Sequence, residues 1–149
     1  MQIALDAMGG DHGHEELIAG ALLAVEQAGL CVTLVGDEGL LQKHLDTLSP
    51  DKKASERIKI VHSSQVIEMN EHPVDAVKKK KDASVMVAFD LVRKGEADAA
   101  VSAGNSGATM AAAVRKLGRL GTISRPGIAS IFPTLKKPVV LMDIGANVD

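Results

Sequence analysis

Glycines and small polar residues are concentrated in the segment 102–109, "SAGNSGAT", which follows a short apolar run and precedes a helical pattern. The start of a helix leaves backbone N–H groups unpaired and carries a partial positive charge, so it can bind an anion. Glycines let an anion approach the backbone closely, and hydroxyl and amide groups can donate further hydrogen bonds. The segment therefore predicts a cradle for phosphate or an oxyanion, with candidate residues Ser102, Gly104, Asn105, Ser106, Gly107 and Thr109.

An ordinary turn explains the same segment without a ligand. In that interpretation Ser106 only caps the helix that follows, which is a common use of serine. The residues by themselves favour neither interpretation, so both stay open at this stage.

A second glycine-rich segment, "DAMGGDHGH" at 6–14, carries more reactive groups. It matches neither the dinucleotide pattern G-x-G-x-x-G nor the P-loop, in which Gly-Lys-Ser or Gly-Lys-Thr is required. Its glycines would let a substrate come close, and its acidic and imidazole groups suit acid–base or hydrogen-bond chemistry. Turn and cap chemistry is again the alternative. The candidate binding residues are Asp6, Gly9 and Gly10, and the candidate acid–base residues are Asp11 and His12.

The neighbouring residues His12, His14 and Glu15 raise the question of a metal site. Their spacing matches no established metal-binding motif, and surface histidines near a helix start are the simpler interpretation. We therefore predict neither a metal site nor a cofactor.

A third turn of the same kind, "DIGANVD" at 143–149, follows the last apolar run of the sequence. Ligands of parallel α/β sheets bind beyond the carboxyl ends of the strands. If the strands before the three turns are parallel neighbours, all three turns line one rim of the sheet. Asp143 and Asn147 are expected to complete that rim.

Apolar runs that predict strands alternate with helical periodicity along the chain. This alternation is typical of a three-layer α/β fold with a mostly parallel sheet and helices on both faces. Two last strands, joined by the turn "PTLKKP", are expected near the C-terminus, and "SPDKKASE" at 49–56 is read as a polar connection. The expected strands are 2–6, 32–36, 58–62, 97–103, 127–132 and 138–144; the expected helices cover 15–28, begin after Asp37, at Pro73 and at Ser84, and run from the turn at 102–109 to Gly118.

Composition narrows the class of protein. The 149 residues are 46% hydrophobic, which is typical of a chain that buries a core. No apolar run approaches the roughly 20 residues of a membrane span, no secretory signal is visible, and a single Cys suits a reducing cytoplasm. A net charge of −2 argues against broad nucleic-acid binding.

The lysine run 78–81 is interpreted as a solvated helix face, with docking of an acidic partner as the alternative.

Four segments, "IALDAMGGDHG", "EADAAVSAGNSGATMAAA", "RPGIASIFPT" and "LMDIGANVD", resemble the phosphate acyltransferases of bacterial phospholipid synthesis, the PlsX family. The resemblance runs through the whole chain in the expected order. It implies a fold similar to the isocitrate and isopropylmalate dehydrogenases. It also implies that residues 1–149 form a single α/β unit, the N-terminal part of a longer protein.

The resemblance further implies an enzyme that makes acyl-phosphate from fatty acyl-acyl carrier protein and inorganic phosphate. The product would pass to a membrane glycerol-3-phosphate acyltransferase, and the enzyme would be a cytoplasmic homodimer associated peripherally with the membrane. Asp11, His12 and Asn105 are then the candidate catalytic residues, and the three turns bind phosphate. Two alternatives remain: a nicotinamide-dependent hydroxyacid dehydrogenase on the same scaffold, and a non-catalytic anion-binding module.

Overall fold

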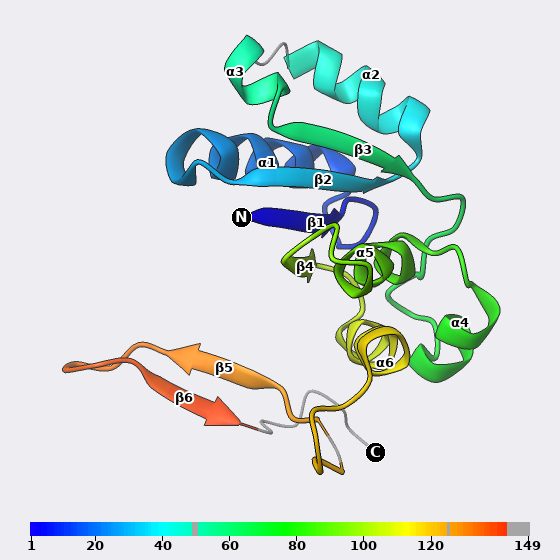
Figure 1. Cartoon of the computed structure of the whole chain (residues 1–149), viewed down its shortest axis with the longest axis vertical. Coiled ribbons are helices and arrows are strands. Elements are labelled where there is room, and N and C mark those ends of the chain that lie inside the picture. The colour runs from blue at the N-terminus through cyan, green and yellow to red at the C-terminus, as the bar shows by residue number, and fades with distance from the viewer. Residues whose placement is uncertain (49–50, 125, 143–149) are drawn as a thin grey trace. The chain divides into compact units, whose positions relative to one another are not determined.

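The computed structural model describes residues 1–48, 51–124 and 126–142. The chain divides into two compact units, Met1–Leu117 and Gly118–Asp149, and each is described by itself. The expectation that residues 1–149 form a single α/β unit stays a prediction. The first unit contains a four-stranded sheet whose order is β3-β2-β1-β4 (Figure 1). Its strands are β1 (Gln2–Asp6), β2 (Cys31–Gly36), β3 (Ile58–His62) and β4 (Ala99–Ser102).

All neighbouring strands of this sheet are parallel, so their carboxyl ends meet at one edge. β1 lies between β2 and β4, and Asp6 at the end of β1 pairs in register with Ser102 at the end of β4. The two glycine-rich segments that follow these strands are therefore neighbours, as the sequence predicts.

Helices cover both faces of the sheet. Because successive side chains of a strand point to opposite faces, Leu34 and Val35 of β2 are buried in different layers. Leu34 packs in a core with Ile18 of α1 (His14–Ala28) and Leu41 of α2 (Glu38–Leu48), whereas Val35 packs with Ala88 of α5 (Ser84–Arg93). The predicted three-layer α/β architecture is thus confirmed, while the likeness to dehydrogenases stays a prediction. The helices are α1 (His14–Ala28), α2 (Glu38–Leu48), α3 (Lys52–Ser55), α4 (Pro73–Lys79), α5 (Ser84–Arg93) and α6 (Ser106–Leu117).

The prediction of a polar connection over 49–56 is wrong in part, because α3 lies within it. Asp51 precedes this short helix, and its side chain accepts a hydrogen bond from the N–H of Ala54. Four residues are too few to show a helical period in the sequence, so only the capping aspartate could have indicated the helix.

The second unit contains a hairpin. Its strands, β5 (Ala129–Phe132) and β6 (Val139–Met142), pair antiparallel in a two-stranded sheet of their own. The two strands and the turn between them are as predicted. However, β6 is not a parallel strand of the four-stranded sheet. The rule that parallel strands end at one edge therefore gives no reason to place the turn after β6 beside the other two turns. Asp143 and Asn147 lie outside the described residues.

Within the described part of the chain, none of the helices combines the length and the apolar character needed to cross a membrane.

Candidate anion-binding site

The carboxylate of Asp6 joins the two turns at the carboxyl ends of β1 and β4. It is buried, with 3% of the residue exposed. Its Oδ2 accepts a hydrogen bond of 2.7 Å from the hydroxyl of Ser102. Its Oδ1 accepts hydrogen bonds from the N–H of Gly9 at 3.1 Å and of Met8 at 3.3 Å. A buried carboxylate needs such partners, so Asp6 serves here to hold the turns together, and its contact with a substrate stays a prediction.

Two glycines let these turns touch. A Cβ added to Gly9 would lie 2.7 Å from Oδ2 of Asp6 and 3.0 Å from Cα of Gly104, and one added to Gly104 would lie 3.3 Å from Cα of Gly9. Gly10 has a φ of 119°, which side chains rarely tolerate. These glycines are therefore required by the contact between the turns themselves, a role that the sequence interpretation, centred on access for a ligand, did not include.

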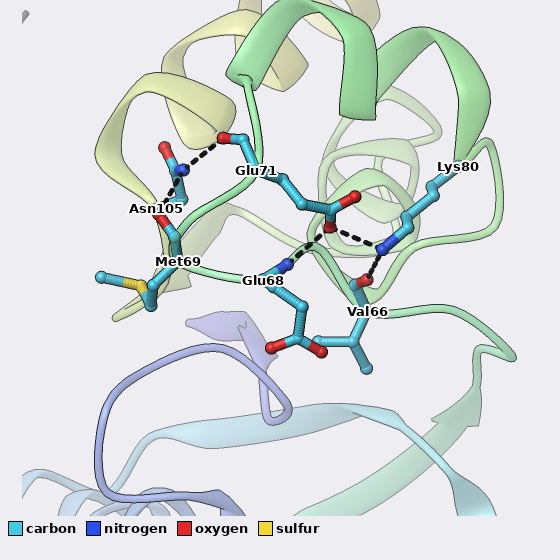
Figure 2. A network of polar contacts seen from close by, with 6 residues as sticks. All are labelled: Val66, Glu68, Met69, Glu71, Lys80 and Asn105. Carbon is cyan, nitrogen blue, oxygen red and sulfur yellow. Dashed lines mark hydrogen bonds and ion pairs between the residues drawn. The ribbon is translucent and has the colours of Figure 1, made fainter.

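Asn105 caps α6 and ties its first turn to a distant loop. Its Oδ1 accepts a hydrogen bond of 3.0 Å from the N–H of Ala108. Its Nδ2 donates to the carbonyl oxygens of Met69 and Glu71, each at 3.1 Å (Figure 2). The cap is thus supplied by Asn105, whereas the alternative interpretation assigned it to Ser106. Both Nδ2 hydrogens are donated within the protein, so the amide has no donor left for a ligand in this arrangement.

The loop that receives Asn105 is itself held by an ion pair. Nζ of Lys80 donates to Oε2 of Glu71 at 2.5 Å and to the carbonyl oxygen of Val66 at 2.6 Å (Figure 2). Oε2 of Glu71 also accepts the N–H of Glu68 at 2.8 Å. The hydrogen bond from Lys80, followed by that from Glu68, lowers the pKa of Glu71 below its ordinary value. Lys80 therefore stabilises the loop to which Asn105 is hydrogen-bonded.

Sequence reasoning missed this role because it treated 78–81 as one surface. Lys78, Lys79 and Lys81 are exposed, but Lys80 is only partly so. α4 ends at Lys79, and the change of backbone direction at Lys80 turns this side chain towards Glu71. The run of identical residues contains no signal that one of them differs from the others.

The remaining polar groups of the turn at 102–109 differ in availability. The hydroxyl of Thr109 donates to the carbonyl oxygen of Asn105, and the hydroxyl of Ser102 accepts the N–H of Gly104. Ser106, in contrast, is exposed. It opens α6 with Gly107, and N–H groups at these two positions have no acceptor within a helix. The donors left for an anion are therefore the N–H groups of Ser106 and of Gly107, which is a buried residue, and the Ser106 hydroxyl; their binding of an anion stays a prediction.

Asp11 and His12 lie in the adjoining turn, between Gly10 and the start of α1, and both are exposed. Gly10 lies against Ala103, because a Cβ added to Gly10 would lie 3.4 Å from the Cβ of Ala103. This turn therefore borders the one at 102–109. The structure thus places Asp11 and His12 where solvent and ligands can reach them. Their acid–base roles stay predictions.

Comparison with known proteins gives the family. The family model described as "Fatty acid synthesis protein" matches residues 1–149. The chain is similar to the phosphate acyltransferase of Nostoc sp., with 49% identity over 151 residues that cover 100% of this chain and 43% of that protein. It is also similar to the phosphate acyltransferases of Desulforamulus reducens, with 50% identity over 149 residues (100% and 44%), and of Pelotomaculum thermopropionicum, with 52% over 149 residues (100% and 42%).

The chain therefore spans less than half the length of these curated relatives. Their names do not favour the alternative of a nicotinamide-dependent dehydrogenase. The match over every residue agrees with the resemblance seen in the four sequence segments, and the chain belongs to the fatty acid synthesis protein family.

Proposed function

We propose that this chain is part of an acyltransferase that forms acyl-phosphate from fatty acyl-acyl carrier protein and inorganic phosphate for phospholipid synthesis. The observation that carries the proposal is identity of about half of all residues, along the whole chain, with proteins named phosphate acyltransferase. The N–H groups that lack a helical acceptor at the start of α6 support it, since both a substrate and an intermediate of this reaction carry negative oxygen atoms.

In the proposed reaction a phosphate oxygen attacks the thioester carbonyl carbon, and a tetrahedral oxyanion forms. The new C–O bond then persists while the C–S bond breaks, and the thiolate of the carrier leaves with the electron pair. A thiol has a pKa of about 8.5, so the leaving group needs little acid assistance. Phosphate itself is the nucleophile, so the protein has to position the reactants and stabilise the oxyanion.

The residues of the site suit these two tasks. The N–H groups of Ser106 and Gly107 and the Ser106 hydroxyl bind phosphate or the oxyanion. Asn105, whose amide is engaged with Met69 and Glu71, positions that turn. Asp11 and His12 orient the substrate or transfer a proton; a part for Asp143 and Asn147, which lie outside the described residues, stays a prediction from the sequence.

The partners follow from the same proposal. Acyl carrier protein supplies the acyl group, and a membrane glycerol-3-phosphate acyltransferase consumes the product. The enzyme is a cytoplasmic homodimer that associates with the membrane surface. Since Lys80 is held by Glu71 and Val66, docking of an acidic carrier on the lysine run would use the exposed Lys78, Lys79 and Lys81.

An assay of acyl-phosphate formation from acyl-acyl carrier protein and phosphate tests the proposal. It is run on the 149-residue chain and on a protein of the relatives' full length that carries these residues. Activity of the longer protein alone supports an enzyme that needs further residues. If neither protein forms acyl-phosphate and the 149-residue chain still binds phosphate, the non-catalytic anion-binding module is the better account.

A further inference from the structure

Three side chains that can ligate a metal lie together on two helices outside the site described above. His14 and Glu15 begin α1, and His44 lies within α2. One ligand atom from each residue, an imidazole nitrogen or a carboxylate oxygen, lies within 4.8 Å of the other two. The rings of His14 and His44 meet edge to face with their centroids 5.5 Å apart. Nδ1 of His44 is 3.9 Å from Oε1 of Glu15.

We propose that His14, Glu15 and His44 bind a divalent transition-metal ion of the zinc type. Two imidazoles and one carboxylate form a ligand set that Zn²⁺ accepts in proteins, with water in the remaining position. The sequence alone predicts no metal here, because His14 and Glu15 are adjacent and have no third ligand at a recognisable spacing. The fold supplies that ligand from α2.

The three ligand atoms, which lie within 4.8 Å of one another, can reach an ion by rotation of their side chains. Bonds of about 2.0–2.2 Å from a tetrahedral Zn²⁺ place ligand atoms roughly 3.3 Å apart. The His44 side chain is 21% exposed and the Glu15 side chain 68% exposed. His44 is thus held between the helices, while the carboxylate can rotate towards both imidazoles.

The helices that carry the ligands are fixed by a common core. Ile18 of α1 and Leu41 of α2 are both fully buried in it. The positive end of the α1 dipole opposes a cation, but the carboxylates of Glu15 and Glu16 in the first turn offset it. A bound ion would connect the first turn of α1 to α2, directly after the turn that contains Asp11 and His12. It would restrain the end of that turn.

The ligand set also predicts which ions bind. Imidazole suits Zn²⁺, Cu²⁺ and Ni²⁺, whereas Mg²⁺ and Ca²⁺ prefer sites built from oxygen ligands. Binding of Zn²⁺ without binding of Ca²⁺ therefore distinguishes a site with imidazole ligands from unspecific attraction of cations to acidic groups.

Calorimetric titration of the whole chain with Zn²⁺, and separately with Ca²⁺, tests the proposal. The variants are His44→Gln and Glu15→Gln, with His72→Gln as the matched control. His72 forms a pair with Asp75, at 3.3 Å, in which both side chains are exposed. Far-ultraviolet circular dichroism without metal verifies folding, and Glu15→Gln alters a side chain that is 68% exposed.

The expected result is one Zn²⁺ per chain, with affinity reduced about tenfold or more by His44→Gln and by Glu15→Gln. His72→Gln leaves the affinity unchanged, and Ca²⁺ gives no measurable heat. Three results would overturn the proposal: no binding of Zn²⁺, equal affinity in folded Glu15→Gln protein, or an equal loss in His72→Gln. The outcome does not depend on the acyltransferase proposal, because it measures the metal alone.

Discussion

The two glycine-rich turns at the carboxyl ends of β1 and β4 use similar residues differently. In the turn at 102–109 the side chains of Ser102, Asn105 and Thr109 all form hydrogen bonds within the protein. In the turn at 6–14 Asp6 is similarly engaged, but Asp11 and His12 are exposed. The turn at 102–109 is therefore held by internal hydrogen bonds and presents backbone N–H groups. The turn at 6–14 presents the exposed side chains of Asp11 and His12. Polar residues in a turn are thus not by themselves evidence of ligand contact.

The contact between the turns should give the largest effect when it is broken. Gly9→Ala places a Cβ 2.7 Å from Oδ2 of Asp6 and 3.0 Å from Cα of Gly104. The Asp6 carboxylate is buried and held by hydrogen bonds, and Cα of Gly104 is backbone, so neither gives way easily. Overpacking of this kind costs about 1–3 kcal/mol, and strain at the Asp6 hydrogen bonds places the loss at the upper end. Urea unfolding measures it.

Gly20→Ala is the control for that substitution. Gly20 lies inside α1, and an added Cβ meets nothing within 4 Å. It should increase the free energy of unfolding by roughly 0.5–1 kcal/mol. Equal stability of Gly9→Ala and wild-type protein would mean that the turns need not touch.

Loss of the Asn105 side chain should have the next largest effect. Asn105→Ala removes the cap of α6 and both hydrogen bonds to the loop at 66–71. Loss of an N-cap costs about 1 kcal/mol, up to roughly 2, and phosphate affinity should fall because the turn loses its support. Urea unfolding and phosphate titration measure the two effects.

Asn70→Ala provides the matched comparison in the same loop. Asn70 is exposed, so the change should stay within about 0.5 kcal/mol and leave phosphate affinity unaltered. If Asn105→Ala changes stability and phosphate affinity no more than Asn70→Ala does, the hydrogen bonds from Asn105 to the loop do not hold the turn at 102–109 in place.

A pH dependence should reveal the ion pair that supports the loop. Lys80 lowers the folded-state pKa of Glu71 below the ordinary value of 4.5. A lowered pKa means that the contribution to stability is fully present above pH 4.5 and is lost as pH falls through the folded-state pKa. Glu71→Gln should therefore show a smaller loss of stability below pH 4.5 than wild-type protein in urea unfolding at several pH values. Parallel curves for the two proteins would contradict the pairing.

Substitution in the turn at 6–14 should have the smallest effect on stability. His12→Gln alters an exposed side chain, so the free energy of unfolding should change by no more than about 0.5 kcal/mol. Turnover of the full-length enzyme should nevertheless fall, by about 100-fold if His12 transfers a proton. His72→Gln, also exposed, serves as control. Unchanged turnover in His12→Gln would remove His12 from the proposed mechanism.

Local patterns in the sequence predict most of the fold and the meeting of the two glycine-rich turns. The apolar runs give the four parallel strands, and the glycine-rich turn at 102–109, followed by a helical pattern, predicts the start of α6 correctly. Parallel strands end at one edge, which brings the segment after Asp6 to the segment after Ser102. These features depend on neighbours in sequence or on a general rule of sheets.

Features that depend on distant residues could not be predicted. Asn105 bonds to Met69 and Glu71, which belong to a loop with no apolar period of its own. Lys80 differs from Lys79 only through its backbone direction at the end of α4. Gly9 and Gly104 are predicted for ligand access, which stays a prediction, and the structure adds a second requirement, because a Cβ on either would meet the other's backbone. Tertiary packing, rather than residue type, decides each of these roles.

Amide chemical shifts recorded during a phosphate titration test the central claim most directly, namely that the first turn of α6 binds anionic oxygen through its backbone. The account predicts that the N–H signals of Ser106 and Gly107 shift most, with saturation, and that chloride at equal ionic strength does not reproduce the shifts. Unmoved signals at these two residues, with saturable shifts elsewhere in the chain, would contradict it.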